Sequence, residues 1–81
     1  MAKVIRSNQD LGAAIRLARK SKGLRQVDVA RQASVRQALV SELENGATTA
    51  KLDTMMRVLA ALDLDLSIIP RRKAEFDPTE Y

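Results

Sequence analysis

The 81-residue sequence contains neither cysteine nor histidine. Their absence excludes disulfides, thiol nucleophiles, imidazole bases and every zinc site built from these side chains. The Asp, Glu, Ser and Lys residues that are present form no motif typical of a catalytic pair. We therefore expect a protein that is not an enzyme and that needs no cofactor or metal.

Aromatic residues and long apolar runs are also scarce. Phe76 and Tyr81 are the two aromatic residues, too few to form the row of rings on which single-strand binders stack bases. The longest strongly apolar stretches, residues 55–56 and 58–62, are far below bilayer length. We expect a cytoplasmic bacterial protein without a membrane partner, and a duplex as the nucleic acid if it binds one.

Basic charge is concentrated in the first half of the chain. Residues 1–46 contain nine Lys and Arg against four Asp and Glu (9 − 4 = +5), and residues 47–81 contain five against six (5 − 6 = −1). Clustered cations favour a polyanionic partner because they attract phosphates and release their counterions. An ordinary solvated surface is the alternative that charge alone leaves open.

Apolar residues at three- and four-residue spacing predict a helix at each end of a small domain. The first covers about residues 8–22, with Ser7 or Asn8 as its N-cap. Gly12 lies inside it, which indicates close packing rather than a function. The last covers about residues 51–62. Its expected apolar stripe is Leu52, Met55, Met56, Leu59 and Leu62.

Two short helices are predicted between them, over Gln26 to Ala33 and Arg36 to Glu44. In the second, Val40 and Leu43 have the spacing of a buried face, and Leu39, beside it, is expected to be exposed. The opposite face consists of Gln37, Ala38 and Ser41. Two short helices around a tight turn are typical of a helix-turn-helix motif, whose second helix enters the major groove of DNA.

The sequence after the last helix alternates between apolar and polar residues up to Pro70, which predicts a strand. A lone strand leaves its backbone groups unpaired, and no other segment resembles a strand, so its copy in a second subunit is the expected partner. The residues expected to be covered in this dimer are Leu64, Leu66 and Ile68.

These elements predict an all-α fold: a compact four-helix domain, one strand that pairs across a homodimer, and a disordered tail. The helix-turn-helix domain is expected at residues 1–64, the dimerisation strand at 65–70 and the tail at 71–81. The tail is charged, contains Pro78 and lacks periodicity.

Residues 8–62 resemble the lambda-repressor-like, Xre-type helix-turn-helix family. The resemblance rests on Gln26-Val27-Asp28-Val29-Ala30, Val35, Gln37-Ala38, Val40-Ser41 and Leu43-Glu44-Asn45-Gly46. It implies that Gln26 meets a phosphate, that Ala30 lies where the two helices touch, and that the recognition helix ends at residues 44–46.

The strand and tail extend the resemblance to HipB-type antitoxins. Members of that family pair strands across a dimer, repress their own operon and bind a HipA-type serine/threonine kinase toxin. The resemblance places Phe76 and Tyr81 as toxin-binding anchors, and an inert tail is the alternative. A stand-alone Xre-type regulator is the alternative within DNA binding, and an adaptor that does not bind DNA is the alternative outside it.

Three positions depart from the family pattern. Arg25 and Arg36 stand where the two helices of the motif commonly have Ser or Thr caps, so capping weakens while a guanidinium is placed near DNA. Ser34 occupies the turn position usually held by glycine, which predicts some strain or a modified turn.

The expected DNA contacts fall into two groups. Arg can read guanine, Gln can read adenine and Ala can touch a thymine methyl. The predicted base readers are Arg36, Gln37, Ala38 and Ser41, the last of which could also be an ordinary surface serine. Amides and cations at helix ends fix register on the backbone without reading sequence. The predicted phosphate contacts are Arg25, Gln26, Asn45 and Lys51.

Overall fold

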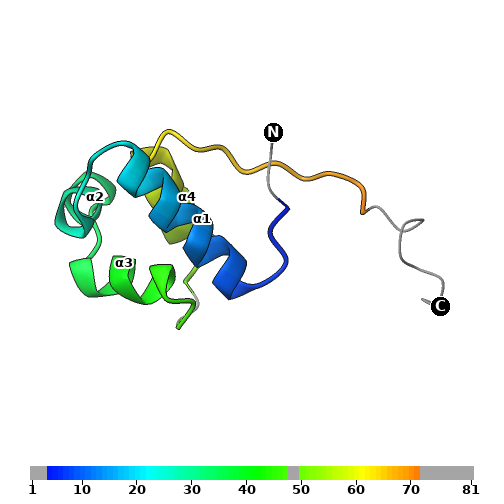
Figure 1. Cartoon of the computed structure of the whole chain (residues 1–81), viewed down its shortest axis with the longest axis horizontal. Helices are drawn as coiled ribbons and strands as arrows, with labels where there is room; N and C mark the ends of the chain where they lie inside the picture. Colours follow the sequence, from blue (N-terminus) through cyan, green and yellow to red (C-terminus); the bar gives the residue numbers. More distant parts are fainter. Residues whose placement is uncertain (1–3, 48–49, 72–81) are drawn as a thin grey trace.

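The computed structural model describes residues 4–47 and 50–71. In this part the chain forms four helices and no strand (Figure 1). They are α1 (Asn8–Ser21), α2 (Gln26–Ala33), α3 (Gln37–Glu44) and α4 (Leu52–Ala61). The four predicted helices are confirmed, with ends that differ from the expected ones by at most one residue.

Helix α1 begins at a side-chain cap and approaches α3 closely. The Ser7 hydroxyl accepts a hydrogen bond from the backbone N–H of Asp10 at 3.0 Å, so the predicted cap is confirmed. A Cβ on Gly12 would lie 2.3 Å from the carbonyl oxygen of Leu43. Any larger side chain would therefore push α1 away from α3, which confirms the expectation of close packing.

The turn between α2 and α3 is strained, as expected from a serine at a glycine position. Ser34 has a φ of 59° and a ψ of 47° in the left-handed region, where a Cβ is unfavourable. The turn is closed by a hydrogen bond of 2.9 Å from the Val35 N–H to the Ala30 carbonyl.

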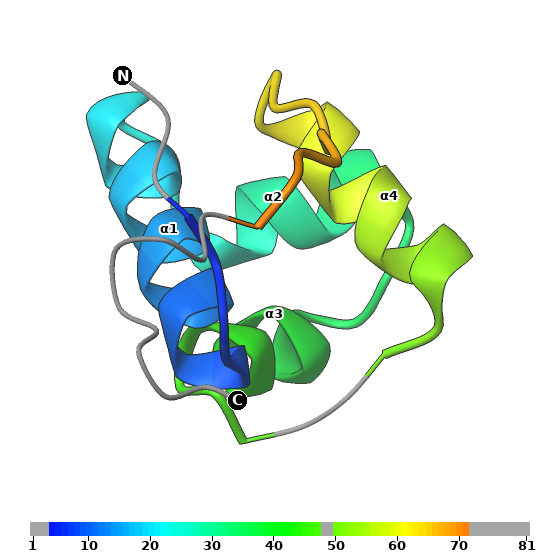
Figure 2. The ribbon, with the colours of Figure 1, turned by 90° about the vertical axis from the view of Figure 1, so that its right-hand side faces the viewer.

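The core lies where α3 packs against α1 and α2, and where α2 packs against α4 (Figure 2). Its buried side chains are Ile15, Val29, Ala30, Ala33, Val40, Leu43, Val58, Leu59 and Leu62. Two expectations were wrong here. Leu52 and Met56 of α4 are 66% and 46% exposed, because Val58, Leu59 and Leu62 form the face that meets α2. Leu39 is half-buried and packs against the core rather than standing exposed.

Residues 64–71 contain no strand in the single chain, so the predicted strand at 65–70, which needs a second subunit, is not confirmed. In Figure 1 this segment, coloured yellow to orange, leaves α4 and extends beyond the helices. Within the described residues, its last backbone hydrogen bond to the domain is from the Leu64 N–H to the Leu59 carbonyl at 2.8 Å. Leu64 packs on the core of its own chain, whereas Leu66 and Ile68 are 53% and 93% exposed. The single chain offers this segment no edge to pair with, and a strand requires one.

Candidate nucleic-acid interface

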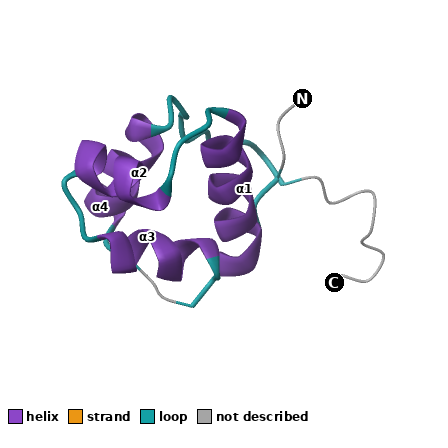
Figure 3. Ribbon diagram, turned by 60° about the vertical axis from the view of Figure 1, so that its left-hand side comes forward, coloured by secondary structure: helices purple, strands orange, loops and turns teal. Residues whose placement is uncertain are grey.

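Helix α3 lies at the rim of the domain (Figure 3). Gln37 and Ala38 are exposed and Ser41 is half-buried, whereas Val40 and Leu43 are buried on the opposite side. This orientation follows from the apolar spacing of the sequence. The three residues predicted to read bases from within the helix therefore share one accessible surface.

A nearly buried polar network lies at the C-terminal end of α3, around the Glu44 side chain. The Glu44 carboxylate pairs with the Nε of Arg19 and accepts a hydrogen bond from the Arg19 Nη2 at 3.0 Å. It also accepts one from the Nε2 of Gln26 at 3.1 Å. Arg19 further donates to the Leu24 carbonyl at 3.0 Å. The start of α2 is thereby fixed against the end of α3.

The network keeps Glu44 ionised. Burial alone would raise the pKa of its carboxyl, but hydrogen bonds from Arg19 and Gln26 and the charges of Arg19 and Arg16 outweigh burial and hold that pKa below its ordinary value. The same hydrogen bond to Glu44 raises the pKa of Arg19. A carboxylate with its own cation and amide partners can orient Gln26 without leaving an unpaired buried charge.

Three of the four helices begin at a basic residue that offers no side-chain acceptor to the first turn: Arg25 for α2, Arg36 for α3 and Lys51 for α4. Side-chain oxygens are the usual caps at such positions. Uncapped N–H groups together with a nearby cation attract an anion, because the helix dipole is positive at this end. Asp28 and Asp53 lie in the first turns of α2 and α4, whereas the first turn of α3 contains no acidic residue. The start of α3 therefore suits a phosphate of a nucleic acid best.

Arg25 is already engaged within the chain. Its Nε and Nη2 lie 3.2 and 3.1 Å from the Asp28 carboxylate, which also accepts from the Arg25 backbone N–H at 2.8 Å. These bonds lower the pKa of Asp28. A phosphate that contacts Arg25 must therefore share it with Asp28, whereas no ion pair of Arg36 or Lys51 occurs among the described residues.

Four of the predicted contacts lie at the two ends of α3, whereas Ser41 lies within the helix and Lys51 lies at the start of α4. Arg36 and Gln37 lie at its start, and Asn45, its exposed C-cap, lies at its end near the residue that holds Gln26. No local pattern predicts the roles of Arg19 and Glu44, because their ion pair joins residues that are far apart in the chain. Phe76 and Tyr81 lie outside the described residues.

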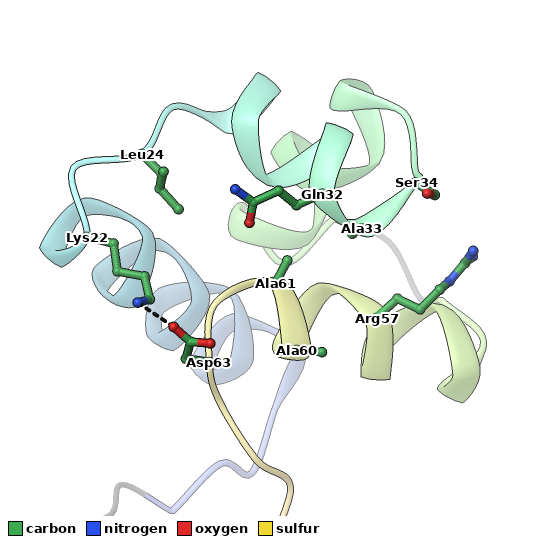
Figure 4. A pocket seen from close by; sticks show the side chains of 9 residues that line it. All are labelled: Lys22, Leu24, Gln32, Ala33, Ser34, Arg57, Ala60, Ala61 and Asp63. Atoms are coloured by element: carbon green, nitrogen blue, oxygen red, sulfur yellow. Dashed lines mark ion pairs between the residues drawn. The ribbon is translucent and has the colours of Figure 1, made fainter.

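A shallow, open depression of about 590 Å³ lies between α2 and α4, and its lining includes no residue of α3 (Figure 4). One edge is the ion pair between the Lys22 Nζ and the Asp63 carboxylate, at 2.7 Å. Leu24, Ala33 and Ala61 provide its apolar lining. It is therefore distinct from the polar face of α3.

Comparison with known proteins identifies the family. Residues 15–69 match the helix-turn-helix family model. The chain belongs to the Xre-type helix-turn-helix family. It is a DNA-binding transcriptional regulator by that membership, and no described helix has the length and apolarity to cross a membrane.

Individual relatives are regulators and antitoxins. The chain is 36% identical over 69 residues to the uncharacterized HTH-type transcriptional regulator y4mF of Sinorhizobium fredii, covering 85% of this chain and 91% of that protein. It is 29% identical over 76 residues to the antitoxin HipB of Escherichia coli K12, covering 94% and 86%. A solved HipA-HipB-O2-O3 complex contains a chain that matches with a TM-score of 0.79 and 27% identity, covering 88% of this chain and all of that one.

Proposed function

We propose that this protein is a homodimeric repressor that binds a palindromic operator through α3 and, as a HipB-like antitoxin, restrains a HipA-like serine/threonine kinase toxin. The observation that carries DNA binding is the accessible polar face of α3, a helix that begins at the basic residue Arg36 without a side-chain cap. The repressor would control its own operon.

Within the operator, bases are read by Arg36, Gln37, Ala38 and Ser41. Arg25, Gln26, Asn45 and Lys51 contact the backbone. The geometry at Gln26 supports its assignment to the backbone contacts. Its hydrogen bond to Glu44 holds the side-chain amide in place at the start of α2 in the absence of DNA. The backbone contacts fix register and the α3 contacts discriminate sequence.

The dimer forms through residues 65–70, which follow the domain of residues 1–64. Support comes from the unpaired backbone of this segment in the single chain and from the exposure of Leu66 and Ile68. A second copy supplies both a strand edge and an apolar surface. Half-sites should then be separated by about 34–36 Å or a multiple of that distance.

The toxin partner is inferred from similarity to HipB, together with the tail of residues 71–81. A stand-alone regulator is a second candidate, because the relative with the higher identity, y4mF, is named only as a transcriptional regulator. Copurification from the native host distinguishes the two, since only the antitoxin should bring down a kinase.

DNA binding itself is tested by selecting duplexes from a randomised pool with the purified full chain. A palindromic site should be enriched, and the isolated site should bind far more tightly than random duplex at the same salt concentration. Equal affinity for both, or salt-insensitive binding, would contradict the proposal and favour an adaptor that does not recognise DNA.

A further inference from the structure

An exposed carboxylate shares the accessible face of α3 with the predicted base readers. Successive residues of an α-helix are turned by about 100°, so residues four apart lie on the same side. Glu42 follows Ala38 by four residues, and both are exposed. Val40 and Leu43, on the other side of the helix, are buried. The Glu42 side chain therefore belongs to the surface that α3 would present to a major groove.

Nothing in the fold favours an acid at this position. Glu42 lies in the last turn of α3, where a negative charge opposes the helix dipole. The residues three and four positions away include no cation, and no ion pair among the described residues involves Glu42. Near DNA phosphates the carboxylate would also weaken the affinity of the protein for DNA of any sequence, because like charges repel. A favourable contact with a particular base would compensate both costs.

We propose that Glu42 is a specificity-determining residue that selects cytosine in the operator half-site. A carboxylate accepts hydrogen bonds but cannot donate them. In the major groove guanine and thymine offer acceptors, adenine offers a donor beside an acceptor, and cytosine offers the N4 amino donor. Cytosine is therefore the base that fits Glu42 best. This inference rests on the proposed operator binding through α3.

The test is site selection from a randomised duplex pool with the wild type, Glu42→Gln and Glu42→Ala. The wild type should enrich cytosine at one position of each half-site. Glu42→Gln should change that position to adenine, because a glutamine amide pairs with adenine through two hydrogen bonds. Glu42→Ala should lose the preference there, with discrimination among the four bases falling about tenfold.

Asp63→Asn is the matched control, because it also removes one negative charge. Asp63 lies beyond α4 with a φ of 58°, a conformation that asparagine tolerates, and it should leave the selected site unchanged. If all four proteins select the same site, Glu42 only repels phosphate and this inference is overturned while the proposed function stands. If the wild type enriches no site, the proposed function fails as well.

Discussion

The Glu44 carboxylate joins Arg19 of α1 to the end of α3, although the two residues are 25 positions apart in the chain. Their side chains are only 2% and 12% exposed, beside a core whose buried side chains are otherwise apolar among the described residues. The pair also holds the Gln26 amide. Stability and the geometry of the proposed DNA-binding surface therefore depend on the same carboxylate.

Glu44→Ala should lower the free energy of unfolding by about 2–4 kcal/mol. The substitution leaves the mostly buried Arg19 guanidinium without its partner, and breaking one side of a buried pair is costly. Urea unfolding followed by circular dichroism measures the change. Glu42→Ala, on the exposed face of the same helix, is the control and should shift stability by less than about 0.5 kcal/mol. Equal unfolding midpoints for the two variants would show that the pair is dispensable.

Stability should also fall in acid through Glu44. Because its pKa is lower in the folded protein than in the unfolded chain, the unfolded state takes up the proton first as the pH falls. The stabilisation is therefore complete above the unfolded pKa of about 4.3 and is lost as the pH drops through the folded pKa. Glu44→Gln should flatten this dependence. Asp28, whose pKa is also lowered, titrates in the same direction, so a residual slope is expected.

Ser34→Gly should stabilise the protein by about 0.5–1 kcal/mol. Glycine adopts the left-handed conformation at a φ of 59° without strain. Part of this gain in stability is lost because glycine increases the conformational entropy of the unfolded chain. Thermal unfolding provides the comparison. Ser34→Ala keeps a Cβ and should give no such gain. A destabilised glycine variant would mean that the serine side chain contributes contacts that outweigh its strain.

Leu66→Asp should convert the proposed dimer to a monomer, because a charge would be buried where residues 65–70 are proposed to pair between subunits. Sedimentation velocity at micromolar concentration reports the change. Leu17→Asp is the matched control, since Leu17 is 68% exposed on α1 and lies outside the proposed interface. A monomeric wild type would reject the proposed interface outright.

The helices and the polar face of α3 could be predicted from the sequence because both follow from local spacing. Three features could not. Which face of α4 meets the core depends on the helices that pack against it. Leu52 and Val58 are both apolar, so the sequence alone does not show which of them is buried. The half-burial of Leu39 depends on packing from outside α3. The ion pair of Arg19 and Glu44 is set by the approach of α1 to α3 at Gly12, which local periodicity does not encode.

Deleting residues 74–81 should leave the proposed dimerisation and operator binding nearly intact. It should weaken the affinity of the protein for its proposed kinase partner. Phe76 and Tyr81 are the expected anchors, since aromatic rings bury a large area at a small entropic cost. Calorimetry of the full and shortened proteins against the purified kinase gives the comparison. Indistinguishable affinities would show that the kinase contacts the folded domain and not the tail.

The most direct test of the account is the effect of Gln37→Ala on the selected operator and on random duplex, beside Lys51→Ala. Loss of base readout should cost about 1–3 kcal/mol on the operator and little on random DNA. Loss of a phosphate contact should weaken both duplexes alike and reduce the salt slope by about one. Equal loss on operator and random DNA for Gln37→Ala would contradict sequence reading by α3.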